Sequence, residues 1–497
     1  MFMSAKTLRL AQRILIIAPA FILYGYNQAG LSALLTLSDV IRLFPQIDTV
    51  NTHGAQETQN STIKGLINGT LMLGALLGAL SCSVLGDKLG RRKTIFVGGC
   101  CAAVGQILQC TAFSLAQFTV GRIILGFGVG QLSVIVPVWQ AEGSSAGKRG
   151  RQVITSGIFI CVGFFLSSWI NLGCSKITSP PLQWRIPLAI PVVFSLVICF
   201  SIFTLPESPR WLVQRGRISA ATEALAALND MPSDHELIRR EVSRIDASLS
   251  TGPTISLRDV LRKNDPHRLG YRFALCLGIQ TLQQLGDIPA IVAASALTWK
   301  FLCSFLSFAA VDRLGRRWIL VTSGTGMCFC MIAMAVATSF PASNQAASIT
   351  AAVFIFLLNM AYPIGFLGGN FLYCTEIAPA PLRAVMSSVS TANHWMWNFI
   401  ITMVTPVALS TISWRYYIVF ACTCACVPVV VLLFFPETMN RDLELIDGVF
   451  REAPTIWEIV PMARRLPQQG SPSAQMENDR EKAVEAEGAT EEQREWA

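Results

Sequence analysis

The sequence predicts an all-α membrane protein that crosses the bilayer many times and is built from two related six-helix bundles. Of its 497 residues, 52% are hydrophobic and only 14% are charged, and the mean hydropathy is +0.49. A soluble domain usually carries about 25% charged residues. Apolar runs of roughly 20 residues recur along the chain, each long enough to cross the hydrocarbon of a bilayer as a helix. Helices are required there because lipid offers the backbone no hydrogen-bond partners.

The apolar runs form two sets of six, separated by a polar linker. We expect a basic amino-terminal segment at 1–13, a first bundle at 14–205, the linker at 206–270, a second bundle at 271–435 and a polar tail at 436–497, disordered from about residue 468. The linker should hold an amphipathic helix at Ala220–Leu228 and a solvated charged helix at Glu236–Asp246. The predicted spans are 14–38, 62–85, 94–115, 117–139, 153–173, 185–205, 271–294, 295–311, 318–340, 347–373, 384–409 and 416–435.

Basic residues gather in three short loops, at 88–93, 148–151 and 313–317, whereas the loops between them contain few. This asymmetry predicts that these loops and both termini lie in the cytoplasm. It also accounts for the net charge of +8 without a nucleic acid partner. The loop at 39–60 is then expected outside, and it leads to Asn60-Ser61-Thr62, a weak signal for glycosylation.

Three motifs occur twice, in the same order, which indicates that the two bundles are repeats. Gly86–Arg92 recurs in the second bundle as Val311–Arg317. Glu142 and Arg149 recur as Glu376 and Arg383 with the same spacing, and Pro206-Glu207-Ser208 recurs as Pro436-Glu437-Thr438. Two parallel halves of this kind can rock against each other around a site in the middle of the membrane.

The second half is shorter than the first at its start. The first span begins near residue 14 and the seventh near residue 273, but the counterpart of Asp87 is reached already at Asp312. Residues 273–311 leave room for barely two spans and no loop. We therefore expect the end of the seventh helix and the start of the eighth to be missing, with a junction after Ala293.

The repeated motifs place charged residues at what are expected to be cytoplasmic helix ends. Such charges can pair between the halves when the inner side is closed and separate when it opens, so that each pair favours one state. The alternative is that they only fix the topology, but Asp and Glu contribute little to that. The candidate gating residues are Asp87, Arg91, Arg92, Arg122, Glu142, Arg149, Glu207 and Arg210 in the first half, and Asp312, Arg313, Arg316, Arg317, Glu376, Arg383 and Glu437 in the second.

Three glutamines mark a candidate binding site within the seventh span. Gln280, Gln283 and Gln284 are spaced i, i+3, i+4 and so share one helix face. Buried amides on one face of a membrane helix require a wet cavity or partners on other helices. They can therefore bind the hydroxyl groups of a solute, or serve as interhelical hydrogen bonds.

Taken together, these motifs resemble the sugar porter family of the major facilitator superfamily, in particular fungal hexose and disaccharide carriers. The resemblance covers roughly residues 10–450. Each motif is weak alone, but their order and spacing are specific. They are Gly86–Arg92, Gly121-Arg122 with Gly126, Pro137–Glu142 with Arg149-Gly150, Pro206–Leu212, Asp312–Arg317, Glu376 with Arg383, and Pro436–Thr438 with Leu443-Glu444.

The resemblance implies the major facilitator fold of twelve helices, here with helices 7 and 8 truncated, and a monomer in the plasma membrane. It implies that the glutamines of the seventh helix bind sugar hydroxyls. Trp395 and Asn398 match an aromatic and an amide that face the substrate, although ordinary packing would also explain Trp395. Phe371 stands where the family has a Trp, which keeps a stacking face but loses the N–H donor.

Several positions depart from the family pattern. Gly157 replaces a Gln, and Asp287 and Pro289 replace a Gly and an Asn. Lys300 and His394 each replace an Asn. These changes indicate a different solute or weakened binding.

The first helix bears on coupling to protons. Proton-coupled members carry an Asp where this chain has Asn27, and an amide does not exchange a proton at physiological pH. The sequence therefore favours facilitated diffusion. The alternatives are proton symport, with His394 or Asp287 as the titrating group, and transport of a cyclic acid such as quinate, for which Lys300 is the candidate cation. A non-transporting sensor or a decayed paralogue is the alternative of another class.

An enzyme is not expected. The sequence has no phosphate-binding loop, no metal-spaced histidine pair among its four His, and no catalytic triad. The 15 Cys are scattered through apolar segments, where packing explains them better than a metal does. The expected partners are a small sugar, the lipid bilayer and, for a symporter, protons; no cofactor is expected.

Overall fold

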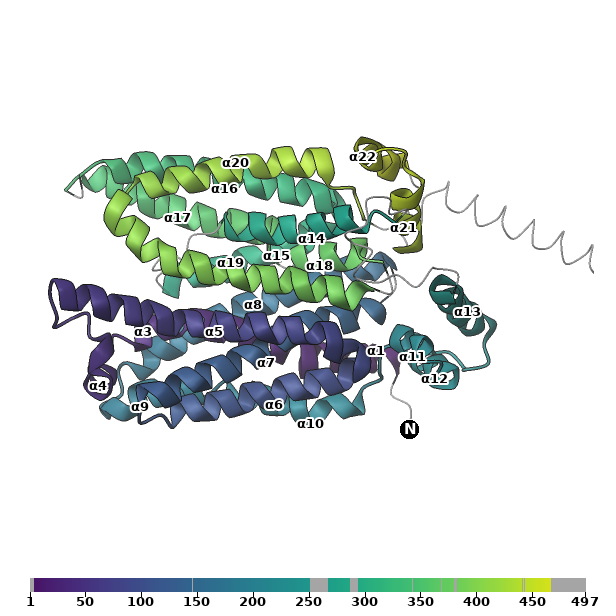
Figure 1. Ribbon diagram of the computed structural model, residues 1–497, viewed down its shortest axis with the longest axis horizontal. Coiled ribbons are helices and arrows are strands. Elements are labelled where there is room, and N and C mark those ends of the chain that lie inside the picture. Colours follow the sequence, from purple (N-terminus) through teal and green to yellow (C-terminus); the bar gives the residue numbers. More distant parts are fainter. Residues whose placement is uncertain are drawn as a thin grey trace, which may run out of the picture.

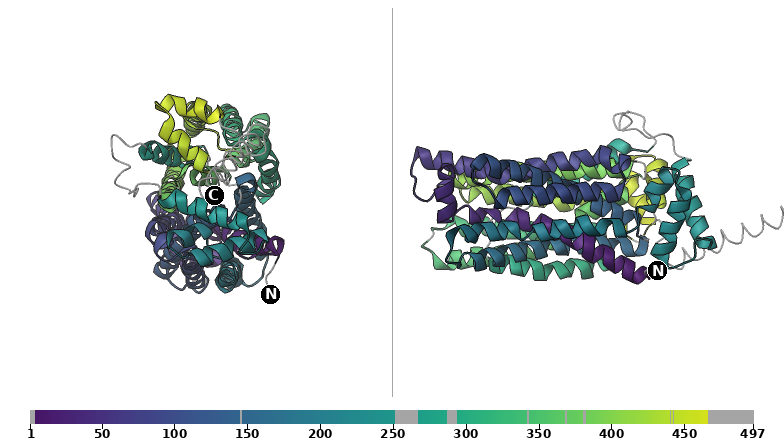
Figure 2. Two further views of the ribbon diagram at one scale, coloured as in Figure 1. Left: turned by 90° about the vertical axis from the view of Figure 1, so that its right-hand side faces the viewer. Right: turned by 90° about the horizontal axis from the view of Figure 1, so that it is seen from below.

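The structure is a computed structural model that describes residues 4–144, 146–250, 267–286, 294–341, 343–367, 369–379, 382–439, 441 and 443–465. Within these ranges every regular element is a helix. Long helices form two bundles that lie side by side, and shorter helices gather at one end (Figures 1 and 2). This is the predicted all-α plan of two related halves.

The amino-terminal half contains six helical spans. They are α1 (Ala5–Gln12) joined through a π-helical turn (Arg13–Ile17) to α2 (Ala18–Ala29), α5 (Ala55–Lys88), α6 (Arg91–Cys110), α7 (Leu115–Glu142), α8 (Ala146–Cys174), and α9 (Pro180–Ala189) followed by α10 (Val192–Ser201) and a 3₁₀ turn (Ile202–Thr204).

The carboxy-terminal half also contains six. They are α14 (Leu269–Gln284), α15 (Ala294–Leu314), α16 (Arg316–Ser339), α17 (Gln345–Gly365) continued by α18 (Gly369–Ile377), α19 (Arg383–Ile412) and α20 (Arg415–Phe434). In the described part of the chain, nine helices are long and apolar enough to cross a membrane. The other three, α14, α15 and α19, are shorter in their apolar part or carry many polar residues.

The first span was predicted at 14–38, which is wrong at both ends. It begins at Ala5, because the basic segment continues the helix and buries Leu8, and it ends at Ala29. The following apolar residues form α3 (Leu31–Leu34), α4 (Ser38–Leu43) and a 3₁₀ turn (Pro45–Ile47). Phe44 there packs against Trp184 of α9, with 6.4 Å between ring centroids. These residues therefore cover the end of the bundle instead of extending the span.

The loop predicted at 39–60 is also shorter than expected, since α5 begins at Ala55. Asn60 lies inside this helix with 5% of its surface exposed. Its amide nitrogen donates a hydrogen bond of 2.7 Å to the carbonyl oxygen of Asp48. The glycosylation signal thus lies on a packed helix instead of a free loop.

Close approach of α5 and α7 depends on glycine. A Cβ atom on Gly78 would lie 2.0 Å from the carbonyl oxygen of Phe127, and one on Gly126 would lie 2.1 Å from that of Leu71. Small residues let membrane helices approach closely, and dispersion then holds them together. Gly126 of the Gly121-Arg122 motif therefore has a packing role.

The suspected truncation falls between α14 and α15. Helix α14 has 16 residues and α15 has 21, against 34 in α5. At ~1.5 Å per residue, α14 is about 24 Å long, which is less than the ~30 Å of a bilayer core. The predicted junction after Ala293 lies outside the described residues, so the missing segment stays a prediction.

The short helices at one end come from the linker and the segment after α20. They are α11 (Pro209–Gln214), α12 (Ile218–Asn229), α13 (Glu236–Ser250), α21 (Leu443–Glu452) and α22 (Ile456–Arg465). The two predicted linker helices are found in α12 and α13, but α13 is not fully solvated, because Ile238 and Val242 pack with Trp211. The tail predicted to be disordered from about residue 468 lies outside the described residues. We call this end of the molecule the basic end and the opposite end the far end.

The two halves meet along several helices. Helix α5 packs against α19, and α8 packs against α15. Near the basic end, α18 and α19 of the carboxy-terminal half contact α7, and α18 also contacts α8. The halves are thus in contact where the repeated charge motifs lie.

Candidate functional site

At the basic end of the first half, a buried ion pair joins α6 to α7. The Arg91 guanidinium donates to both carboxylate oxygens of Glu142, each at 2.9 Å, and to Asp87 at 3.2 Å. Ser208 donates to Glu142 at 2.6 Å. Arg91 and Glu142 are both buried. A paired, bidentate geometry is what allows two charges to stay out of water.

The turn between α5 and α6 is built around Glu207. Its carboxylate accepts hydrogen bonds from the backbone N–H groups of Arg91 and Arg92, at 3.2 and 3.1 Å. Gly90 turns the chain at φ +89°, and a Cβ there would lie 2.9 Å from a Glu207 oxygen. Only glycine adopts this conformation without strain and leaves room for the carboxylate. Burial raises the pKa of Glu207, although the backbone N–H groups of Ser208 and Arg92 and the nearby arginines oppose this shift.

The carboxy-terminal half repeats this arrangement. The backbone N–H groups of Arg316 and Arg317 donate to Glu437, at 3.0 and 3.1 Å. Gly315 has φ +87° and its Cβ would lie 2.7 Å from a Glu437 oxygen. Glu376 accepts from Thr438 at 2.6 Å and lies 3.5 Å from Arg316. The sequence repeat is therefore a repeat of hydrogen bonds.

Both Arg–Glu pairs lie within one half, which differs from the predicted pairing between halves. The reason is that each repeat carries a complete set of partners. Between the halves, Arg383 lies close enough to Glu142 for an electrostatic interaction. The guanidinium of Arg383 also donates to the carbonyl oxygen of Thr375 at 3.1 Å, within its own half.

Arg122 was predicted at a cytoplasmic helix end, and this is wrong. It lies two turns from the start of α7, toward the far end, because α7 reaches the basic end at Glu142. Its side chain is buried and donates to the carbonyl oxygen of Asn68 at 3.2 Å. The Gly121-Arg122 motif matched the family pattern, but the pattern does not indicate how far along its helix Arg122 lies.

Contacts or exposure are described for four of the remaining predicted gating residues, and two others have side chains outside the described residues. Arg92 and Arg317 cap matching carbonyl oxygens, those of Phe203 and Leu432. Arg210 lies in the first turn of α11 and is partly buried, while Arg313 is exposed in the last turn of α15. The side chains of Arg149 and Asp312 lie outside the described residues.

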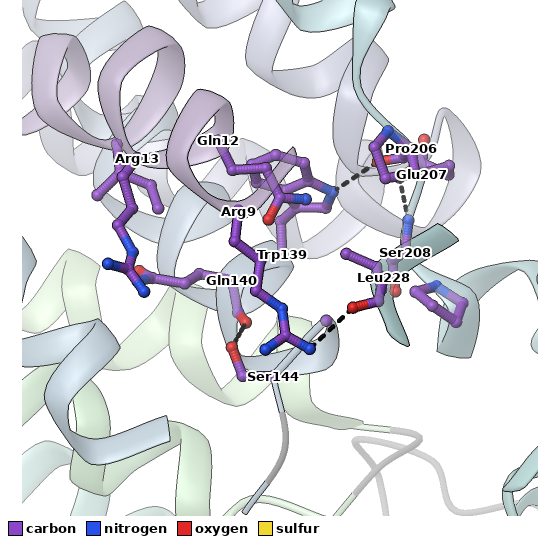
Figure 3. A pocket seen from close by; sticks show the side chains of 13 residues that line it. Arg9, Gln12, Arg13, Trp139, Gln140, Ser144, Pro206, Glu207, Ser208 and Leu228 are labelled. Carbon is purple, nitrogen blue, oxygen red and sulfur yellow. Dashed lines mark hydrogen bonds between the residues drawn. The ribbon is translucent and has the colours of Figure 1, made fainter. Parts of the chain in front are cut away.

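A cavity of about 20 Å³, room for a single water molecule, lies beside Glu207 where α1, the end of α7 and α12 meet (Figure 3). Arg9 of α1 donates to the carbonyl oxygen of Leu228 at 2.8 Å, near the end of α12. Trp139 donates to the carbonyl oxygen of Pro206 at 3.2 Å. These contacts tie the first helix and the linker to the charge cluster.

Midway along the molecule, the predicted glutamines meet His394 of α19. The His394 ring nitrogens lie 2.8 Å from the Tyr24 hydroxyl, 2.9 Å from the Gln284 amide nitrogen and 3.2 Å from a Gln283 oxygen. Gln283 also donates to the Tyr362 hydroxyl at 2.9 Å. All of these side chains are buried. The three glutamines thus belong to one hydrogen-bonded network between helices, which we call the central network.

Asn370 is a member of this network that the sequence did not single out. Its amide donates to Gln280 at 2.7 Å and to Gln283. Asn370 directly precedes Phe371, which stands where the family has a Trp. A polar residue next to this predicted binding position was the sequence signal that could have identified Asn370. The Gln280 amide nitrogen and the Asn370 oxygen are buried and have no hydrogen-bond partner among the residues that the structure describes. A donor and an acceptor are therefore left open beside each other.

The other predicted binding residues surround the network. Phe371 and Trp395 flank His394, with ring centroids 6.0 and 5.4 Å away. Asn398 lies 3.5 Å from Gln284. Trp395 donates to Ser133 of α7 at 3.4 Å and packs on Tyr24, with 5.0 Å between ring centroids. Trp395 therefore contacts the other half and also packs against the central network.

Two further positions, Lys300 and Asn27, bear on the charge of the solute and on coupling to protons. The Lys300 ammonium lies 4.4 Å from the ring centroid of Tyr362 and 5.4 Å from that of Phe164. This places a cation beside a member of the network. Asn27 is buried, and its amide nitrogen donates to the carbonyl oxygen of Leu23 at 2.8 Å, one turn earlier in the same helix. Gly157 is buried in α8, whereas Asp287 and Pro289 lie outside the described residues.

Comparison with known proteins gives consistent results. A family model described as "Sugar (and other) transporter" matches residues 14–293 and 286–450. The MFS-type transporter oryC of Aspergillus oryzae is 33% identical, over 87% of this chain and 84% of its own length. The sugar transporter STL1 of Saccharomyces cerevisiae is 28% identical, over 87% and 80%. The proton:xylose symporter XylE, bound to 6-bromo-6-deoxy-D-glucose, has a TM-score of 0.79 at 19% identity, over 90% of this chain and 99% of that one. The last likeness shows the major facilitator fold.

Proposed function

This chain belongs to the sugar transporter family, and from that premise we propose that it carries a neutral hexose, small saccharide or polyol across a membrane by alternating access. Relatives named as sugar, fructose and glucose transporters support this solute class. The proposed membrane is the plasma membrane, and the proposed working form is a monomer.

The central network is the observation that carries the proposal. A sugar hydroxyl both donates and accepts, as do the amides of glutamine and asparagine. Within the described part of the chain, the Gln280 nitrogen and the Asn370 oxygen are a buried donor and a buried acceptor without partners. Burying such a pair is costly unless a ligand supplies the missing hydrogen bonds. Phe371 and Trp395 offer apolar faces for the ring of a sugar.

The charge clusters supply the gate in this proposal. Helices α18 and α19 pack against α7. In this proposal the contact is the closed gate, and a solute leaves at the basic end when these helices separate. Because each half keeps its own Arg–Glu pair, the two halves can move as units around the network. We place the basic end in the cytoplasm, following the basic loops.

Facilitated diffusion is the proposed mode, because Asn27 provides no carboxylate at the coupling position. Symport with protons is the alternative, and the position of His394 within the network supports it. A histidine held by Tyr24, Gln283 and Gln284 would change the whole network on protonation.

A second solute class is favoured by one observation. The Lys300 ammonium beside Tyr362 would complement a carboxylate on a cyclic polyol such as quinate. A neutral sugar has no use for that charge, so competition between quinate and glucose would distinguish the two classes.

Uptake of labelled glucose, xylose, lactose and quinate in a carrier-deficient yeast tests the proposal. The present chain is compared with a version that has about 30 residues restored after Ala293, the length suggested by the repeat offsets. Surface expression is measured for both. A protonophore and a pH series separate uniport from symport, because uniport continues when the proton gradient collapses.

Each outcome has a distinct meaning. Sugar uptake that is insensitive to the protonophore supports uniport. Collapse of uptake overturns the interpretation of Asn27 and leaves His394 and Asp287 as the candidate titrating groups. Uptake by the restored version alone means that the junction inactivates the chain. If neither version moves any of the four solutes despite surface expression, the proposed function is wrong and a sensor or a decayed paralogue is the better description.

A further inference from the structure

A groove of about 670 Å³ lies at the basic end of the amino-terminal half. Its walls are the turn between α5 and α6, the start of α6, the 3₁₀ turn after α10, and helices α11 and α12. Three membrane-spanning segments thus meet two linker helices around it. Its lining includes Lys88, Arg92, Lys93, Phe203, Arg215 and Arg217.

The groove carries an excess of positive charge. Five cationic side chains line it, against the two carboxylates of Glu207 and Glu223. Glu207 is already occupied by backbone N–H groups of the α5–α6 turn. Among the described residues, Lys88, Lys93 and Arg217 form no ion pair. These three charges face a space large enough for a phosphate-bearing ligand.

One wall of the groove belongs to the lipid-facing surface. Phe203 lines the groove and is 49% exposed, and Phe200, one turn earlier, is 81% exposed. Both lie in the span Pro180–Thr204. The Arg92 guanidinium lies 5.5 Å from the Phe203 ring centroid, so charge and apolar surface adjoin. A ligand with an anionic head and an apolar tail fits both features, whereas a soluble anion uses only the first.

The same corner of the carboxy-terminal half is arranged differently. There α22 packs against α20, and Trp457 lies on Phe434 with 5.4 Å between ring centroids. The repeated Arg-to-carbonyl contacts, from Arg92 and Arg317, show that the corners correspond. In the second half, a segment of the chain itself therefore covers the position that is a groove in the first.

We propose that this groove binds the headgroup of an anionic phospholipid, with the phosphate held by Lys88, Lys93 and Arg217 and the acyl chains lying along Phe200 and Phe203. The cytoplasmic leaflet is the side on which anionic lipids concentrate, and the proposal shares the orientation given above. It does not depend on the identity of the transported solute, since the groove is separate from the central network.

The test is lipid retention by the purified full-length chain, measured by native mass spectrometry. The ligands are phosphatidylserine, phosphatidylcholine and soluble glycerophosphoserine. The triple variant Lys88→Gln, Lys93→Gln, Arg217→Gln is compared with a control that loses the same charge elsewhere at this end, Arg239→Gln, Arg240→Gln, Arg465→Gln. Each Lys or Arg near an anionic headgroup contributes about a five-fold change in affinity, so the triple variant should bind phosphatidylserine roughly 100-fold more weakly.

The control variant should bind phosphatidylserine within about two-fold of the wild type. Equal losses in the two variants would mean diffuse attraction to the whole surface and would overturn the site. Equal retention of phosphatidylcholine, or glycerophosphoserine binding as tight as the lipid, would overturn the anionic lipid as ligand.

Single variants guard against loss of folding in the triple variant. Lys93→Gln and Arg217→Gln change exposed side chains and should each weaken phosphatidylserine binding about five-fold. Their thermal unfolding midpoints without lipid should match the wild type, while the rise in midpoint on adding phosphatidylserine should shrink. A full rise in both single variants contradicts the proposal.

Discussion

Arg91 and Arg316 stand at the same place in the two halves, each directly after the glycine of its turn, but their contacts differ. Arg91 reaches both oxygens of Glu142 at 2.9 Å, whereas Arg316 lies 3.5 Å from Glu376. The glycine turn, the glutamate that caps it and the hydroxyl at 2.6 Å from the paired glutamate are the same in both. The repeat thus preserves the backbone geometry of the turn more closely than the length of the Arg–Glu contact.

The halves also differ in what they bring to the centre. The central network draws its amides and its histidine from α14, α18 and α19 of the second half, and the first half contributes the Tyr24 hydroxyl. We infer that the first half is the firmer frame and that the second half selects the solute. The predictions below test this division of roles.

The largest expected effect is on stability, from removing the tighter ion pair. Arg91→Ala leaves Glu142 buried without its bidentate partner, which should cost about 3–5 kcal/mol. Arg316→Ala breaks a longer contact and should cost about 1–3 kcal/mol. Thermal unfolding in detergent should therefore give a lower midpoint for Arg91→Ala. Equal midpoints would mean that the two Arg–Glu pairs contribute equally to stability.

A smaller effect is expected from the second half's share of the network. Gln283→Ala removes a side chain that contacts His394, Asn370 and Tyr362, and should lower sugar uptake by about 10- to 100-fold, equivalent to about 1–3 kcal/mol. Asn359→Ala is the matched control, since among the described residues that buried amide donates to the carbonyl oxygen of Ile355 in its own helix and does not join the central network. Kinetics of uptake at matched surface expression provide the measurement. Similar losses in both variants would place the effect in folding.

The first half's share of the network should matter less. Tyr24→Phe removes one hydrogen bond to His394 and should change uptake by about five-fold, or about 1 kcal/mol. Tyr26→Phe removes a hydrogen bond to the carbonyl oxygen of Pro187 within the first half and serves as the control. If Tyr24→Phe abolishes uptake while Gln283→Ala does not, the assignment of roles to the halves is reversed.

The smallest effect concerns pH. Burial raises the pKa of Glu207 above its ordinary value of 4.5, so the folded chain binds this proton more readily than the unfolded chain. Its contribution to stability is then fully present below pH 4.5 and is lost as pH rises through the folded pKa. The stability of the wild type relative to Glu207→Gln should therefore be greater at low pH than at neutral pH. A difference that does not change with pH would contradict the raised pKa.

The fold was predictable because its signals are long and repeated. Apolar runs gave the two sets of helices, and the matches between Asp87 and Asp312 and between Glu142 and Glu376 gave the two halves. The glutamines at 280, 283 and 284 were predictable from helical spacing. The Tyr24–His394 contact was not, because partners from helices far apart in sequence leave no local pattern. Asn370 was missed, although it directly precedes Phe371. The predicted end of the first helix was wrong because the apolar residues after it, such as Phe44, pack against a neighbouring helix instead of extending the span. The predicted depth of Arg122 in the membrane was wrong because α7 is long.

Burial of Asn60 has a consequence for the order of events during synthesis. An oligosaccharide transferase needs the amide nitrogen, which here is buried and bonded to the carbonyl oxygen of Asp48. If the basic end lies in the cytoplasm, as proposed above, this residue emerges on the lumenal side before the later helices exist. A glycan on Asn60 can therefore be added only to chains whose second helix has not yet packed. The fraction of chains that carry a glycan on Asn60 would therefore report the rate of translocation relative to the rate of folding.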